Sequence, residues 1–153
     1  MGLRVNTISM IAATMLTAAA APAGAEVLDA VYRGTLVCDK LPFTDNKMRE
    51  AIDVTIGGGA ASYTHVVRLR ELAETVTEKG AGKVDGQAIS LEGTWKGSGR
   101  EYKAKYSGTF VRRSAKLTGT QTWTDGGKTI TRACSGAIKR PLKAFLPRNK
   151  KKP

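Results

Sequence analysis

The sequence EYKAKYSGTFVRRSAKLTGTQTW, residues 101–123, alternates apolar and polar side chains on both sides of the turn-forming RRS at 112–114. Such alternation is typical of strands that bury one face. The same pattern recurs along the chain and predicts eight strands, at residues 30–38, 49–57, 61–70, 73–79, 87–96, 101–111, 115–124 and 128–138. Turn signals separate them, among them the glycine-rich stretches 57–59, 80–82, 97–99 and 125–127. Many short strands with short connections predict an all-β fold, an antiparallel up-and-down barrel or a barrel-like sandwich.

Glycine occupies the centre of several of these strands, as in YRGTL (32–36), LEGTW (91–95), YSGTF (106–110) and LTGTQ (117–121). Glycine weakens a strand but permits the sharp curvature of a small closed barrel. Two-residue hairpin loops centred on 98–99, 113–114 and 126–127 keep every apolar residue of the last four strands on one face. This register places the glycines on the inward face. It also predicts one inward row of Leu91, Tyr106, Gln121 and Arg132.

The two cysteines, Cys38 and Cys134, lie near the two ends of the predicted barrel domain. In an exported protein such a pair predicts a disulfide, here between the first and the last strand. Closing a loop of about 100 residues stabilises a fold by roughly 4–5 kcal/mol in the chain-entropy model. Gly108 and Gly119 are expected to leave space beside Cys134.

The chain divides into three parts. Residues 1–25 combine Arg4, an apolar run and the small residues AGA at 23–25, which predicts a cleaved secretory signal peptide and export to a bacterial periplasm or beyond. Residues 26–138 form the predicted barrel domain, and no transmembrane span is expected after cleavage. Residues 139–153 are predicted to be a disordered or loosely docked tail. The tail contributes strongly to the net charge of +12, because it holds no acid and seven basic residues: Lys139, Arg140, Lys143, Arg148, Lys150, Lys151 and Lys152.

Arg132 is the most informative candidate for a site, because its phase points it into the barrel. No acidic residue of the last four strands shares that phase, apart from Asp125 at a turn. An inward arginine without a carboxylate would bind an anionic ligand together with Gln121 and Tyr106, with Tyr102 and His65 as weaker candidates. Alternatively, Arg132 stacks on Trp123, plugs one barrel end, or pairs with an acid from the first four strands.

The sequence offers little sign of enzymatic chemistry. His65 is the only histidine, and no metal-binding, phosphate-binding or nucleophile motif is present, so no cofactor and no metal are expected. Glu71, Glu74 and Glu78 could converge from neighbouring turns, but Glu74 and Glu78 are predicted to lie on an exposed strand face.

Two functional hypotheses follow, both for a non-enzymatic binding protein. In the first, the barrel holds a small anionic or amphipathic ligand near Arg132. In the second, the barrel is filled, and its outer surface and basic tail contact anionic polymers, lipids or a partner protein of the envelope. Nucleic acid is disfavoured as a partner of an exported protein. A cavity around Arg132 would favour the first hypothesis, whereas a packed Arg132–Trp123 plug would favour the second.

Overall fold

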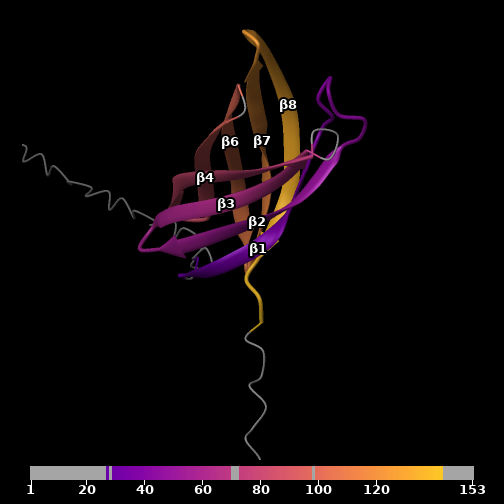
Figure 1. The fold of residues 1–153 in the computed structure, drawn as a ribbon. Helices are drawn as coiled ribbons and strands as arrows, with labels where there is room; N and C mark the ends of the chain where they lie inside the picture. The colour runs from indigo at the N-terminus through magenta and orange to yellow at the C-terminus, as the bar shows by residue number, and fades with distance from the viewer. Residues whose placement is uncertain (1–26, 28, 70–72, 98, 143–153) are drawn as a thin grey trace, which may run out of the picture.

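The computed structural model describes residues 27, 29–69, 73–97 and 99–142, so the predicted signal peptide lies outside the described residues. The described residues form eight antiparallel strands that close into a barrel in sequential order (Figure 1), which confirms the predicted fold. The strands are β1 (Ala30–Cys38), β2 (Met48–Gly57), β3 (Ala60–Leu69), β4 (Glu74–Asp85), β5 (Ala88–Gly97), β6 (Arg100–Val111), β7 (Ser114–Asp125) and β8 (Lys128–Lys139). Within this part of the chain, no helix is long and apolar enough to cross a membrane.

Seven strands begin and end within about one residue of their predicted bounds, whereas β4 differs at its C-terminal end. The sequence predicted that this strand ends at residue 79 and that GAG at 80–82 is a turn. That prediction was wrong, because β4 continues to Asp85 and Gly80 pairs with Tyr63 of β3. The turn to β5 is the next one along the chain, at Gly86 and Gln87.

The predicted register of the last four strands is correct for two of the three hairpins. Leu91 lies opposite Tyr106, and Gln121 lies opposite Arg132. The β6–β7 register was wrong by two residues, since its loop is centred on 112–113 and Tyr106 lies opposite Gly119 instead of Gln121. A slip of two residues keeps every side chain on its face, so the apolar pattern alone does not detect it.

The disulfide between Cys38 and Cys134 joins two residues that lie directly opposite each other in the β1–β8 pair that closes the barrel. Gly119 is the neighbour of Cys134 on β7, as expected. The expectation for Gly108 was wrong, because this residue lies opposite Leu117. A disulfide of this kind indicates an oxidising, extracellular-type compartment.

The two ends of the barrel differ. The β1–β2, β3–β4, β5–β6 and β7–β8 connections lie at one end, which we call the loop end. The other end, which we call the tail end, carries the tight turns 58–59, 86–87 and 112–113 and the point where the chain leaves β8 (Figure 1). Apolar side chains such as Tyr32, Phe110 and Ile138 fill the tail-end half of the interior.

Candidate functional site

Glu78 lies at the centre of a polar network inside the barrel. It is 0% exposed, so the prediction that it lies on an exposed face was wrong. The alternation itself carried the signal, because Glu78 shares the inward phase of Val76. A buried carboxylate is costly unless hydrogen bonds replace its water, so the network around it decides whether the fold tolerates it.

Five side chains from three strands contact the Glu78 carboxylate. Tyr102 and Tyr106 of β6 donate their hydroxyls to Oε2 at 2.9 and 3.2 Å, and the Tyr63 hydroxyl of β3 donates to Oε1. His65 Nδ1 lies 3.1 Å from Oε2, and Gln121 Nε2 of β7 donates to it at 3.3 Å. The carboxylate therefore has partners on both oxygens.

Glycine makes one of these contacts sterically possible. A Cβ atom built on Gly93 of β5 would collide with the Tyr63 hydroxyl and lie 2.8 Å from Glu78 Oε1. A Cβ atom on Gly80 would collide with the Tyr63 ring. The glycine of LEGTW thus does more than bend a strand, because it leaves the space in which Tyr63 reaches Glu78.

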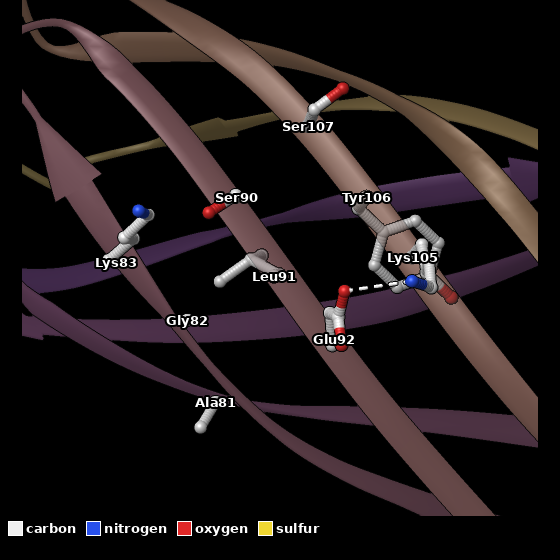
Figure 2. Close-up of a pocket in the computed structure, with 9 residues that line it drawn as sticks. All are labelled: Ala81, Gly82, Lys83, Ser90, Leu91, Glu92, Lys105, Tyr106 and Ser107. Carbon is white, nitrogen blue, oxygen red and sulfur yellow. Dashed lines mark ion pairs between the residues drawn. The ribbon is translucent and has the colours of Figure 1, made fainter.

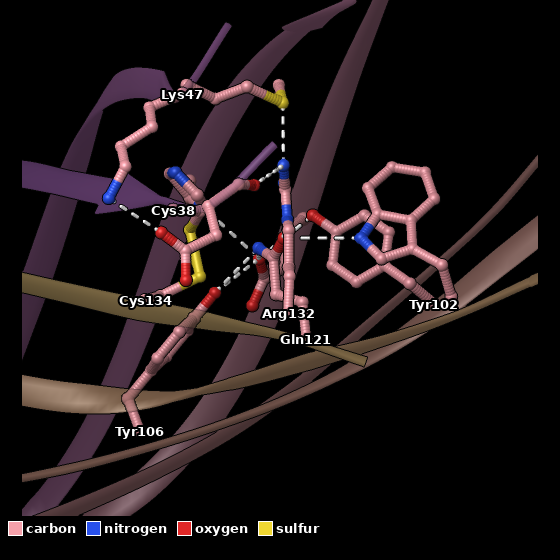
Figure 3. Close-up of a disulfide and its surroundings, with 12 residues drawn as sticks. Cys38, Lys47, Tyr102, Tyr106, Gln121, Arg132 and Cys134 are labelled. Atoms are coloured by element: carbon pink, nitrogen blue, oxygen red, sulfur yellow. Dashed lines mark hydrogen bonds and ion pairs between the residues drawn. A yellow bond between two sulfur atoms is a disulfide. The ribbon is translucent and has the colours of Figure 1, made fainter. Parts of the chain in front are cut away.

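Arg132 is 4% exposed and is held by neutral groups (Figure 3). Its Nε donates to Gln121 Oε1 at 2.8 Å, and its Nη2 donates to the same oxygen. Its Nη1 contacts the Asp39 carbonyl at 3.3 Å and the Met48 sulfur, and its guanidinium lies 5.4 Å from the centre of the Trp123 ring. Burial lowers the pKa of Arg132 to about 10. The predicted stacking of Arg132 on Trp123 is confirmed.

Gln121 connects the two buried charged residues. Its amide nitrogen donates to Glu78 and to the Tyr106 hydroxyl at 2.8 Å, while its oxygen accepts from Arg132. The first four strands therefore supply the inward-facing acidic residue that the last four strands lack. The sequence left this possibility open because it did not determine the register of β4.

The segment 39–47 between β1 and β2 packs over this part of the loop end. Leu41 is buried, and the Phe43 ring lies 5.9 Å from the Trp123 ring in an edge-to-face arrangement. The Asp39 carbonyl accepts from Arg132, and Lys47 forms a 2.9 Å ion pair with the Asp39 carboxylate. Arg132 is thus enclosed by the network below it and by this segment above it.

Three of the network residues are tyrosines whose hydroxyl groups have raised pKa values. Burial, and then the charge of Glu78, raise the pKa of Tyr63 and Tyr102 well above the ordinary value of 10. The pKa of Tyr106 is raised by the same two causes, although Gln121 and Arg132 partly oppose them. These hydroxyls therefore serve as hydrogen-bond donors over the physiological pH range.

His65 is the network residue that keeps an unused group. It is 1% exposed, and its Nε2 has no hydrogen-bond partner among the described residues. Of the other two acids considered from the sequence, Glu74 lies 3.9 Å from Arg100 in an ion pair, and Glu71 lies outside the described residues. The structure thus brings His65, Tyr102, Tyr106, Gln121 and Arg132 into one network and adds Glu78 and Tyr63, whereas ligand binding by these residues stays a prediction.

A shallow groove of about 710 Å³ runs over the outer wall of β4, β5 and β6 (Figure 2). Lys83, Ser90 and Ser107 border it, together with a 3.0 Å ion pair between Lys105 and Glu92. That pair neutralises itself, which leaves the exposed Lys83 as the one unbalanced charge among the residues that line the groove.

The tail end carries a concentration of basic side chains. Arg33 of β1 lies opposite Lys139 of β8 in the strand register, and Lys116 lies on β7. Arg112 and Arg113 form the β6–β7 turn. Arg140 follows β8 and donates its backbone N–H to the Arg113 carbonyl at 2.9 Å. We call these six residues the basic cluster. Of the predicted tail contacts, Lys139 and Arg140 belong to it, whereas Lys143, Arg148, Lys150, Lys151 and Lys152 lie outside the described residues.

Comparison of the chain with protein families, with curated proteins and with solved structures found no match.

Proposed function

We propose that this chain is an exported, non-enzymatic binding protein that acts through its tail end on phosphate or carboxylate groups of the cell envelope. The observation that carries the proposal is the basic cluster, which lies where the seven-cation tail leaves the barrel. Like charges gathered on one face attract polyanions and are screened by salt.

The interior supports this choice. The reason to expect an anionic ligand at Arg132 was the apparent lack of a carboxylate, and Glu78 supplies one through Gln121. A ligand anion would add a second negative charge to a network that already balances Glu78 against Arg132. The packed contact between Arg132 and Trp123 is the arrangement expected of a filled barrel.

The same enclosure argues against catalysis. Glu78, His65 and the tyrosines combine residue types used in acid–base chemistry, but a substrate must reach them. Glu78 and His65 are fully buried, and their hydrogen bonds run to each other and to neighbouring side chains. We therefore assign the network to folding.

The test is binding of the mature protein, residues 26–153, to inorganic polyphosphate, measured by calorimetry at several salt concentrations. One triple variant, Arg112→Ser/Lys116→Ser/Lys139→Ser, removes exposed cations of the basic cluster. A matched variant, Lys96→Ser/Lys103→Ser/Lys128→Ser, removes three exposed lysines from strands β5, β6 and β8 outside that cluster.

We expect the first variant to weaken binding about 100-fold at low salt, at about 1 kcal/mol per cation, and the second to weaken it less than about 5-fold. Equal losses in the two variants would mean that net charge alone drives binding. That result, or the absence of binding to polyphosphate, would overturn the proposal.

A second candidate function rests on the unpartnered Nε2 of His65. A small ligand held inside the barrel would offer this nitrogen a hydrogen-bonding group. Native mass spectrometry of gently purified protein tests this directly, because a carrier would show an added mass that is lost on denaturation. If the ligand were anionic and bound at Arg132, Arg132→Met would abolish the added mass while the barrel stayed folded.

A further inference from the structure

The β6–β7 turn at the tail end uses an unusual residue. Arg112 has a φ of +57°, a left-handed conformation that is unfavourable for a residue with a side chain. Glycine occupies the corresponding first loop position in three other hairpins of the described chain, at Gly58, Gly86 and Gly126. An arginine kept in a glycine conformation indicates a role for its side chain beyond making the turn.

Exposed apolar side chains gather at the same end. Among the described residues, the large apolar side chains that are exposed are Val31, Val111 and Leu142, and the last two are 68% and 76% exposed. Val111 directly precedes Arg112, and Val31 is the second residue of β1. Leu142 follows the end of β8 by three residues.

Hydrogen bonds hold Leu142 near this turn. Arg113 Nη2 donates to the carbonyl oxygens of Arg140 and Pro141, at 3.2 and 3.1 Å. The segment that leaves β8 therefore lies against the 112–113 turn. Leu142 directly follows this segment, and Val111 directly precedes the turn. Beyond Leu142 the sequence continues with Phe145, Leu146 and five further cations.

One cation of the basic cluster is paired with an acid, since Arg33 lies 3.8 Å from Asp53 of β2 in an exposed ion pair. The acidic residues of β6, β7 and β8 are Glu101 and Asp125, which lie at the loop end. Both are already paired there, Glu101 with Lys96 at 3.8 Å and Asp125 with Arg100 at 3.1 Å. Among the described residues, no ion pair joins the other five residues of the basic cluster to an acid, so the tail end combines net positive charge with exposed apolar side chains.

We propose that the tail end docks on an anionic lipid bilayer, with the basic cluster at the headgroup phosphates and with Val111 and Leu142 in the interfacial layer. This inference rests on the proposed function and narrows its target to lipid. At an anionic membrane surface, both the cations and the apolar side chains of one face contribute to the binding free energy. With a soluble polyanion, only the cations contribute.

Co-sedimentation of the mature protein with vesicles tests the docking. One set of vesicles contains phosphatidylglycerol and phosphatidylcholine in equal parts, and the other contains phosphatidylcholine alone. The variant Val111→Ser/Leu142→Ser keeps every charge. We expect it to lower partitioning into the anionic vesicles about 10-fold and to leave polyphosphate binding unchanged. Weak binding of the wild-type chain to the neutral vesicles completes the expected pattern.

Arg112→Gly provides a second variant that is not expected to fail by misfolding. Glycine suits the turn, so we expect a higher unfolding midpoint together with a loss of about 5-fold in partitioning. Lys128→Gly, which removes one cation next to the 126–127 turn at the loop end, is the control of equal charge and should leave partitioning within about 2-fold of the wild type.

Two results would overturn the docking inference, and they are distinguishable. In the first, Val111→Ser/Leu142→Ser partitions like the wild-type chain, while the triple variant Arg112→Ser/Lys116→Ser/Lys139→Ser no longer binds vesicles or polyphosphate. The lipid inference then fails and the proposed function stands. If the wild-type chain binds neither polyphosphate nor anionic vesicles, both fail together.

Discussion

Glu78 and Arg132 are buried in the same half of the barrel and are joined through one side chain, since Gln121 donates to Glu78 at 3.3 Å and accepts from Arg132 at 2.8 Å. Neither charged group has another oppositely charged Asp, Glu, Lys or Arg within ion-pair distance among the described residues. Apart from His65, whose Nδ1 lies 3.1 Å from Glu78 Oε2, each therefore depends on the other for electrostatic balance, through an amide that orients both. This relationship predicts that the network contributes to the stability of the fold.

A double-mutant cycle should reveal this dependence. Glu78→Gln or Arg132→Gln alone leaves one buried charge without its counterpart, and we expect each to cost about 3–5 kcal/mol of unfolding free energy. The double variant should cost less than the sum by about 1–3 kcal/mol. Urea unfolding followed by circular dichroism measures all four proteins. Simple additivity would show that the two residues act independently.

The network should also make the fold sensitive to alkali. The pKa values of Tyr63, Tyr102 and Tyr106 are raised above 10 by burial and by Glu78, so above pH 10 the unfolded chain binds fewer protons than the native chain. Stability must then fall as the pH rises. Arg132 opposes this, because its pKa is lowered to about 10 and the native chain loses that proton first. The three tyrosines lower the free energy of unfolding as the pH rises, and the one arginine raises it. The net result above pH 10 is a decrease of about 3 kcal/mol per pH unit.

Absorbance of tyrosinate and circular dichroism, recorded together from about pH 8 to about pH 12, check this prediction. Most of the tyrosinate signal should appear together with the loss of β structure. Ionisation of all four tyrosines near pH 10 in an intact barrel would contradict it.

Gly93→Ala should destabilise the barrel by about 1–3 kcal/mol, because the added methyl group would collide with the Tyr63 hydroxyl beside Glu78. Gly57→Ala is the matched control, since Gly57 also lies in a strand and has open space around its Cβ position. The unfolding midpoints of the two variants should differ clearly. Equal midpoints would mean that Tyr63 moves aside without cost.

Removal of the disulfide should cost about 4–5 kcal/mol in the chain-entropy model, given a separation of 96 residues between Cys38 and Cys134. Urea unfolding of Cys38→Ala/Cys134→Ala and of the oxidised wild-type protein measures the difference in unfolding free energy. Reduced wild-type protein should behave like the variant. A loss below about 1 kcal/mol would show that the β1–β8 pairing holds without the covalent link.

The alternation of apolar and polar residues predicts most of the architecture. Which side chains face inward in β5 to β8 followed from period two, because a strand turns each successive side chain to the opposite face. The same rule explains two errors. A register shift of two residues in β6–β7 leaves all faces unchanged, and the charge of Glu78 outweighed its inward phase in the prediction.

The sequence by itself predicted an up-and-down barrel or barrel-like sandwich, the inward faces of the last four strands, the disulfide and the inward position of Arg132, because local periodicity and short connections leave few alternatives. The strand order of the first half and the closure of the barrel came from the tertiary structure. Only the tertiary structure decided what Arg132 balances. Closure of the barrel brings Glu78 of β4 and Arg132 of β8 to the same amide, and this meeting depends on the register of every strand between them. The tertiary structure likewise decided that Arg112, Arg140 and Leu142 lie at one end of the barrel. A hydrogen bond between two segments far apart in the chain cannot be predicted from the sequence of either segment alone.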